Sequence, residues 1–170
     1  MKMEYRKLKI LLGCMAFAVV SFGQTPAEYE ANYKARIQLE MINGVYIPFD
    51  QQDAFDELTR RSVPAGIAEF KNSPEDSIRR KLHFGLGRWI LINWGLEEGS
   101  RISDYMKKHG VALPDDMVEV IIITWHRHLN GRPLKYNEEV AIIDKRVKEE
   151  KAKRDEQAQK TVLEKKPHKE

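Results

Sequence analysis

Two histidines near the end of an apolar stretch are the first residues that could do chemistry. They lie in Trp125-His126-Arg127-His128, and histidine rings bind metals and transfer protons near neutral pH. On a helix, however, side chains two residues apart point roughly 160 to 200° away from each other, whereas metal ligands on one face are spaced by three or four residues. The spacing therefore predicts no metal site, with His126 at the surface and His128 half-buried.

Two adjacent carboxylates are the second candidate. Asp115 and Asp116 directly follow Pro114, and paired carboxylates carry out glycosidic chemistry in many enzymes. Acids just after a proline are also typical of a helix start, because the positive end of the helix dipole favours them. We favour this capping role. A small hydrolase that uses Asp115 or Asp116 with a histidine, either His83 or His126, stays open as the alternative.

The glycines of Phe84-Gly85-Leu86-Gly87 resemble a phosphate-binding loop only superficially. In such a loop the glycines lie between a strand and a helix, and a lysine and a hydroxyl residue follow. Here the surrounding pattern predicts that the four residues lie inside a helix, where each glycine costs about 1 kcal/mol relative to alanine. We therefore interpret them as a place of close helix packing.

A last group of candidates surrounds the loop from Gly95 to Ser100. Arginine and aromatic side chains beside a glycine-containing loop suit a binding surface. They equally suit a structural role, in which Trp94 closes the core and Asn93 caps a helix, and both interpretations stay open. The candidate binding residues are Arg88, Asn93, Trp94 and Arg101, together with Asp115, Asp116 and His126.

The elements that must position these residues are mainly helices, because apolar residues recur at helical spacing. Two helices, over 74–94 and 114–130, are apolar nearly all round and should form the core with Trp89 and Trp125. Residues 45–48 are expected to be extended, since Pro48 disfavours a helical residue before it. The other expected helices are one over 26–42 that ends at Asn43-Gly44, one capped by Asp50 that carries Phe55 and Leu58, one over 64–70, and one from Ser100 to Gly110.

The composition changes after Pro133. Four apolar residues could dock one more helix, but no large apolar residue lies between Lys148 and Lys160. Acids and bases alternate there as i to i+4 pairs worth about 0.2 to 0.5 kcal/mol each, and the missing a and d positions disfavour a coiled coil. We expect a charged tail over 135–170 that is helical or disordered. The four apolar residues are Val140, Ile142, Ile143 and Val147.

The first residues are typical of a secretory signal peptide. A basic start precedes an apolar run of 13 residues from Ile10 to Phe22, whereas a membrane span needs about 20. Small residues then predict cleavage between Gly23 and Gln24, with export to the periplasm or the outside and no stable membrane span afterwards. A lipoprotein site at Cys14 and an uncleaved anchor or core helix are the disfavoured alternatives.

Removal of residues 1–23 changes the charge. The whole chain has 29 basic and 26 acidic residues, and the leading segment holds four of the basic and one of the acidic ones. The remaining chain then has 25 of each and no net charge, which excludes a charge argument for nucleic-acid binding. Cys14 is the only cysteine, so the exported chain has no disulfide or zinc-thiolate site. We expect no metal and no cofactor.

A series of short motifs runs in order from about residue 45 to 134. They are Tyr46-Ile47-Pro48, Leu82-His83-Phe84-Gly85-Leu86-Gly87-Arg88-Trp89-Ile90, Asn93-Trp94-Gly95-Leu96, Ser100-Arg101, Pro114-Asp115-Asp116-Met117, His126-Arg127 and Leu129-Asn130-Gly131. In this order and at these intervals they resemble a family of small uncharacterised bacterial domains of unknown function. Where that family has a second Trp-Gly-Gly-like loop, this chain has Glu97-Glu98-Gly99. The resemblance implies a shared fold and brings no activity, cofactor or catalytic residue.

The sequence thus predicts a small, single-domain helical bundle of about five helices. Its parts would be a signal peptide over 1–23, an amphipathic helix over 24–44, a helical domain over 45–134 and the charged tail over 135–170. A non-enzymatic binding or interaction module of the envelope, with a protein or other envelope partner, is the favoured function. The hydrolase is the alternative, and a purely structural envelope role is a third possibility.

Overall fold

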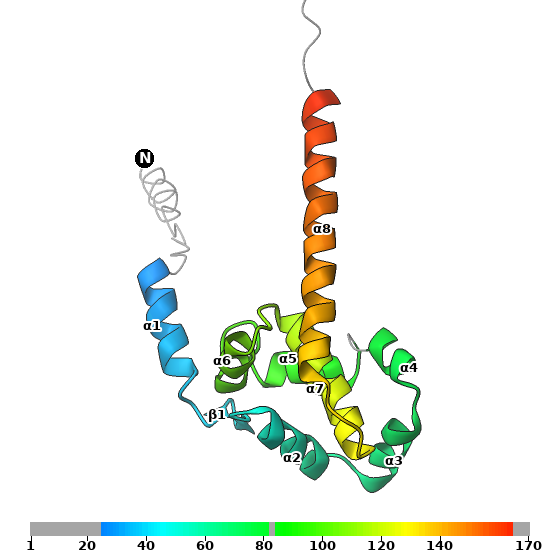
Figure 1. The fold of residues 1–170 in the computed structure, drawn as a ribbon. Helices are drawn as coiled ribbons and strands as arrows, with labels where there is room; N and C mark the ends of the chain where they lie inside the picture. Colours follow the sequence, from blue (N-terminus) through cyan, green and yellow to red (C-terminus); the bar gives the residue numbers. More distant parts are fainter. Residues whose placement is uncertain (1–24, 82–83, 165–170) are drawn as a thin grey trace, which may run out of the picture.

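The computed structural model describes residues 25–81 and 84–164 (Figure 1). The expected mainly α fold is confirmed, but the described part holds eight helices instead of about five. The expected signal peptide and His83 lie outside the described residues. In chain order the elements are α1 (Pro26–Arg36), β1 (Met41–Ile42), β2 (Val45–Tyr46), α2 (Gln51–Arg61), α3 (Pro64–Asn72), α4 (Glu75–Arg80), α5 (Leu86–Asn93), α6 (Arg101–Lys108), α7 (Pro114–Leu129) and α8 (Tyr136–Glu164).

Helix α7 is the centre of the fold. It contacts α2, α3, α4, α5, α6 and α8, and its side chains are buried almost continuously from Asp116 to Arg127. Pro114 opens the helix and the two aspartates lie in its first turn, as the sequence predicts. Each fully buried large apolar side chain contributes about 1.5 to 3 kcal/mol to folding. The run of Val, Ile and Trp side chains in α7 therefore supplies much of the core.

The prediction of one helix over 74–94 is wrong, because the chain forms two separate helices there. Helix α4 ends at Arg80, and α5 begins after Gly85, whose φ of +54° lies in a region that glycine enters easily. The glycines of the Phe84–Gly87 stretch are therefore not both inside a helix. Trp89 is only half-buried, whereas Trp94 and Trp125 are buried. The core thus uses Trp94 in place of the expected Trp89.

The helix expected over 26–42 is also wrong at its end. Helix α1 stops at Arg36, and Met41–Ile42 pairs antiparallel with Val45–Tyr46. Asn43 and Gly44 form the two-residue turn, with φ of +49° and +77°. Asn-Gly is a preferred pair for this hairpin turn because both positions need positive φ. The dipeptide therefore marks a hairpin and does not end a helix.

Several helix starts agree with the sequence. The Asp50 carboxylate accepts the backbone N–H of Asp53 at 2.8 Å and caps α2, and Ser100 caps α6 through Ser103. Ser73 does not cap α4, because its hydroxyl donates to the carbonyl of Glu69 at 2.9 Å and so belongs to the end of α3. Local capping chemistry is thus well predicted where one short-range partner decides it.

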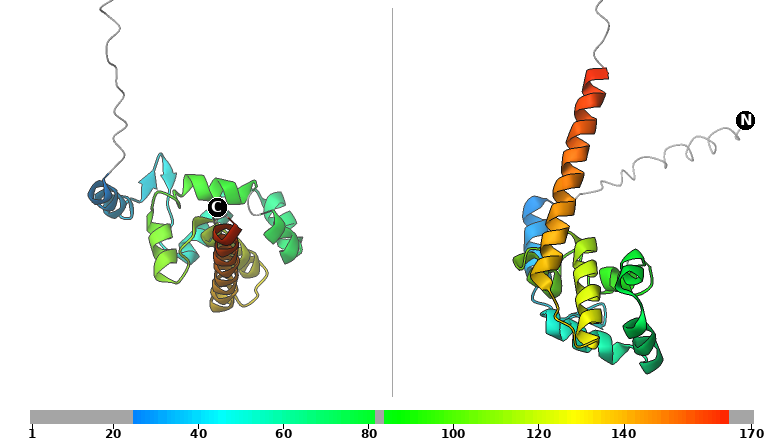
Figure 2. Two further views of the ribbon diagram at one scale, coloured as in Figure 1. Left: turned by 90° about the horizontal axis from the view of Figure 1, so that it is seen from above. Right: turned by 45° about the vertical axis from the view of Figure 1, so that its right-hand side comes forward.

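Helix α8 is a single helix of 29 residues, about 43 Å long at 1.5 Å per residue. Its first turns pack on the core, with Ile143 buried and Val140 and Val147 partly buried, whereas Ile142 is 52% exposed. Beyond Val147 the helix projects away from the domain (Figure 1). Figure 2, left, looks down α8 and places α1 at one edge of the molecule and α3 and α4 at the opposite edge. No helix in residues 25–81 and 84–164 has the length and apolarity of a membrane span.

Candidate functional site

An open groove lies between α3, α4, α5 and α7. It has a volume of about 250 Å³. The lining side chains Ile78 and Ile122 are 8% and 3% exposed, and Phe84 is 74% exposed. Phe70 and Leu86 also line it and are partly buried against the core. The groove therefore offers a mainly apolar surface to a ligand. Its polar lining residues are Glu69, Ser73, Ser77 and Lys81.

His126 supports the α3 wall of this groove. It is 3% exposed while His128 is exposed, so the expected exposures of the two histidines are wrong and in fact reversed. Its Nε2 donates to the carbonyl of Lys71 at 3.2 Å, and its Nδ1 accepts from the Arg132 guanidinium at 2.9 Å. Because Arg132 can only donate, Nδ1 must be the acceptor and Nε2 carries the hydrogen. The ring of His126 also packs edge-on against Phe70, with centroids 5.3 Å apart.

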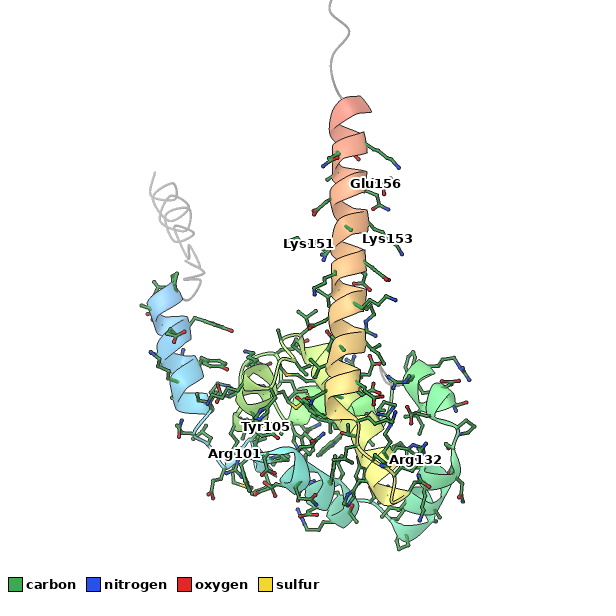
Figure 3. All side chains as sticks on the ribbon, viewed as in Figure 1. Arg101, Tyr105, Arg132, Lys151, Lys153 and Glu156 are labelled. Atoms are coloured by element: carbon green, nitrogen blue, oxygen red, sulfur yellow. The ribbon has the colours of Figure 1, made fainter. Side chains whose placement is uncertain are left out.

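Beside the groove lies a connected set of charged side chains that we call the ionic network. It joins α4, α7, α8 and the loop after α7, where Arg132 is labelled in Figure 3. The network contains four arginines and four carboxylates, so its charges balance. Its members are Glu75 and Arg79 of α4, Asp116, Glu119 and Arg127 of α7, Arg132, and Glu139 and Arg146 of α8.

Glu139 is the most deeply buried carboxylate of the network, with its side chain 2% exposed. Its two oxygens accept from Arg79 and Arg127, each at 2.7 Å. Arg79 also contacts Glu119 at 2.6 Å, and Arg127 contacts Glu75 at 2.5 Å. Buried charges are tolerated only when they are paired and hydrogen-bonded. These contacts therefore fix α8 against α4 and α7.

The network shifts the pKa of its acids in different directions. Hydrogen bonds from Arg127 hold the pKa of Glu75 below its usual value. Burial raises the pKa of Asp116, although Arg146 at 2.5 Å opposes the shift. Pairing with arginine thus determines the direction of the pKa shift at Glu75, whereas desolvation determines it at Asp116.

Asp116 and His126, one acid–histidine pair of the alternative hydrolase, do not meet, whereas His83 lies outside the described residues. Asp116 and His126 lie ten residues apart on α7, which is about 15 Å along a helix, whereas proton transfer needs about 2.6 to 3.2 Å. Asp115 is exposed in the first turn of α7. In the two described ranges, no group of three or more His, Cys, Asp or Glu side chains is placed to hold a metal.

The groove and most of the ionic network lie in one continuous stretch of the chain, with only Arg132, Glu139 and Arg146 of the network beyond α7. Residues 47–129 match the family model of a domain of unknown function, DUF6794. The match confirms the expected likeness to an uncharacterised domain family. No curated protein and no solved structure matches the chain. Every residue that lines the groove lies within the DUF6794 segment, whereas α1 and α8 lie outside it.

Arg101, within the DUF6794 segment, braces the hairpin. Its guanidinium lies 4.9 Å from the ring centre of Tyr46 and 5.8 Å from that of Phe49. Its Nε donates to the carbonyl of Ile47 at 2.5 Å, and its side chain is only 15% exposed. Such stacking on aromatic rings is a favourable cation–π contact. Arg101 therefore holds the segment that follows β2 against α6.

The other candidates around the loop do not gather at one surface. Trp94 is fully buried in the core, and the Asn93 amide donates to the carbonyl of Trp89 at 2.9 Å, one helical turn earlier. Arg88 is exposed on α5. This placement fits the structural interpretation of Asn93 and Trp94.

The glycine loop of the DUF6794 segment is covered by helix α1. The Arg36 Nε donates to the carbonyl of Gly99 at 3.0 Å, and the Tyr33 hydroxyl donates to Asp104 at 3.3 Å. A Cβ at Gly99 would lie 2.4 Å from the Tyr33 ring, so only glycine allows this approach. A hollow of about 600 Å³ between α1 and the loop is lined in part by Glu97 and Glu98. Helix α1 of the same chain thus covers this surface of the loop.

Sequence reasoning missed both the groove and the ionic network. The groove is built from four helices, and the partners in the network are up to 60 residues apart. One signal was present, because Glu119 and Arg127 interrupt the apolar pattern of α7. Charged residues inside such a pattern need partners from elsewhere in the fold.

Proposed function

We propose that this chain is an exported, non-enzymatic binding module whose groove takes an apolar segment of a protein partner. The exposed Phe84 beside the apolar lining of the groove carries the proposal. Exposed apolar surface around a hollow is typical of a site that a partner covers. The separation of Asp116 from His126 argues against the form of the hydrolase that would use His126.

Helix α8 supports a role in reaching a partner. Its last 17 residues, 148–164, extend about 25 Å beyond the packed turns at 1.5 Å per residue. The ionic network fixes the base of this helix through Glu139 and Arg146. Charged residues such as Lys151, Lys153 and Glu156 project from its exposed part (Figure 3). The helix would thus hold the groove at a set distance from whatever binds its far end.

Export rests on the basic start and the apolar run that precede Gln24. Fractionation of cells that produce the whole chain would test it, together with N-terminal sequencing. We expect the chain in the envelope or the medium with Gln24 as its first residue. An intact chain that stays in the cytosol would refute this part of the proposal.

A photo-crosslinking amino acid at a groove position tests partner binding. Ser77 lines the groove, and Asp56 is an exposed position of α2 that does not. Incorporated at Ser77 in producing cells, the probe should give a discrete protein adduct that is absent at Asp56. A lack of any adduct at Ser77, or the same adducts at both positions, would contradict groove binding.

A further inference from the structure

The chain contains two Asn-Gly sequences in very different settings. Asn43-Gly44 is the exposed turn of the hairpin, and Asn130-Gly131 follows the last turn of α7. In an Asn-Gly sequence the glycine backbone nitrogen can attack the asparagine side-chain amide, because no Cβ on glycine hinders the approach. The two sites therefore contain the same pair of reacting groups, in two different surroundings of one chain.

Both reacting groups are held in place at Asn130. Its side-chain amide donates to the carbonyl of Lys71 at 3.1 Å and to that of His126 at 2.9 Å. The backbone N–H of Gly131 donates to the carbonyl of His128 at 3.0 Å. Attack at this site would have to break all three hydrogen bonds.

At Asn43 neither reacting group is held. Within the part of the chain that the structure describes, the Asn43 side chain and the Gly44 N–H make no hydrogen bond. Both residues are exposed, and the space around Gly44 is open. Water and hydroxide therefore reach the amide and the nitrogen without local unfolding.

We propose that Asn43 is a site of spontaneous deamidation in the folded protein, and that the fold protects Asn130 from the same reaction. The Gly44 nitrogen loses its proton to water or hydroxide and forms a bond to the Asn43 side-chain carbon. The amide nitrogen takes a proton from water as its bond to that carbon breaks, and it leaves as ammonia. Water then opens the resulting ring at either carbonyl, which gives aspartate or isoaspartate.

The modification would change the hairpin. Aspartate keeps a two-residue turn, because Asp-Gly also suits this turn type, and adds one negative charge. Isoaspartate lengthens the backbone by one methylene group and so disturbs the pairing of Ile42 with Val45. Ile42 is buried in the core, and Tyr46 on the next strand stacks against Arg101. The isoaspartate form should therefore weaken the contact between Arg101 and the Tyr46 ring.

Peptide mass mapping of the purified folded chain over time, at neutral and mildly alkaline pH, tests the inference. Asn43 should convert at least about tenfold faster than Asn130, since that site must first lose hydrogen bonds, and faster at the higher pH. In denaturant the two rates should become similar. Equal rates in the folded chain, or an Asn43 that converts only in denaturant, would overturn the proposal.

Two variants distinguish attack by the Gly44 nitrogen from other slow chemical changes in the chain. Asn43→Gln keeps an amide but places it one carbon too far for the same ring, so conversion at position 43 should stop while slow conversion at Asn130 continues. Gly44→Ala adds a Cβ that meets no other atom within 4 Å but strains the turn, because φ at this position is +77°. The added Cβ hinders the approach of the nitrogen and should slow conversion at Asn43. A Gly44→Ala chain that folds and converts at the original rate would contradict attack by the Gly44 nitrogen.

Discussion

Neutralising Glu139 should strongly destabilise the protein. The Glu139→Gln side chain has the same shape, but it leaves Arg79 and Arg127 without the carboxylate that each contacts at 2.7 Å. Removal of one partner from a buried ion pair costs about 3 to 5 kcal/mol. Because Glu75 and Glu119 still contact the two arginines, we expect the lower end, about 3 kcal/mol. A domain of this size should then lose roughly 6 to 12 °C in melting temperature.

Glu138→Gln is the matched control for this experiment. Glu138 is adjacent in sequence, but its side chain is 63% exposed and, among the described residues, forms an ion pair with Lys135 alone. An exposed pair of this kind is worth less than about 1 kcal/mol. The free energy of unfolding would be measured from urea titrations followed by circular dichroism. Similar losses in Glu138→Gln and Glu139→Gln would refute the idea that the ionic network holds α8 in place.

Three further predictions concern acid, the groove wall and α1. Because hydrogen bonds from Arg127 lower the pKa of Glu75, the native state binds fewer protons there than the unfolded chain, so this stabilisation is present above pH about 4.3. It should be lost as the pH falls further, and urea titrations should show a smaller loss in Glu75→Gln. His126→Phe removes two part-buried hydrogen bonds and should cost about 1 to 3 kcal/mol, with faster amide exchange in α3. Unchanged exchange there would argue against the supporting role of His126. Gly99→Ala should push the Tyr33 ring away, and it should also strain the loop because φ at Gly99 is +97°. We expect faster proteolysis within α1 and a lower melting temperature, whereas a protected α1 would show that its contact with the loop adapts.

The parts of the fold that depend on local chemistry could be predicted from the sequence. Asp50, Ser100 and Pro114 each start a helix because one nearby backbone group or the helix dipole decides the outcome. The apolar pattern also identified α7 as a core helix. These features need no knowledge of distant residues.

The sequence-based predictions were wrong where residues far apart in the chain determine the structure. Apolar periodicity alone could not show that the chain turns at Gly85, or that Asn43-Gly44 joins two short strands. His126 is buried because Lys71 and Arg132 satisfy both its ring nitrogens, and neither partner is visible from its spacing to His128. The site was missed for the same reason, since the groove exists only after four helices pack together.

The most direct test of groove binding is hydrogen exchange on the chain alone and on the chain with the partner captured through the probe at Ser77. Groove binding should slow amide exchange in α3 and α5, which form groove walls, and leave exchange unchanged in α1, at the edge of the molecule opposite α3 and α4. Protection confined to α1 or to the projecting part of α8, with α3 and α5 unchanged, would contradict it.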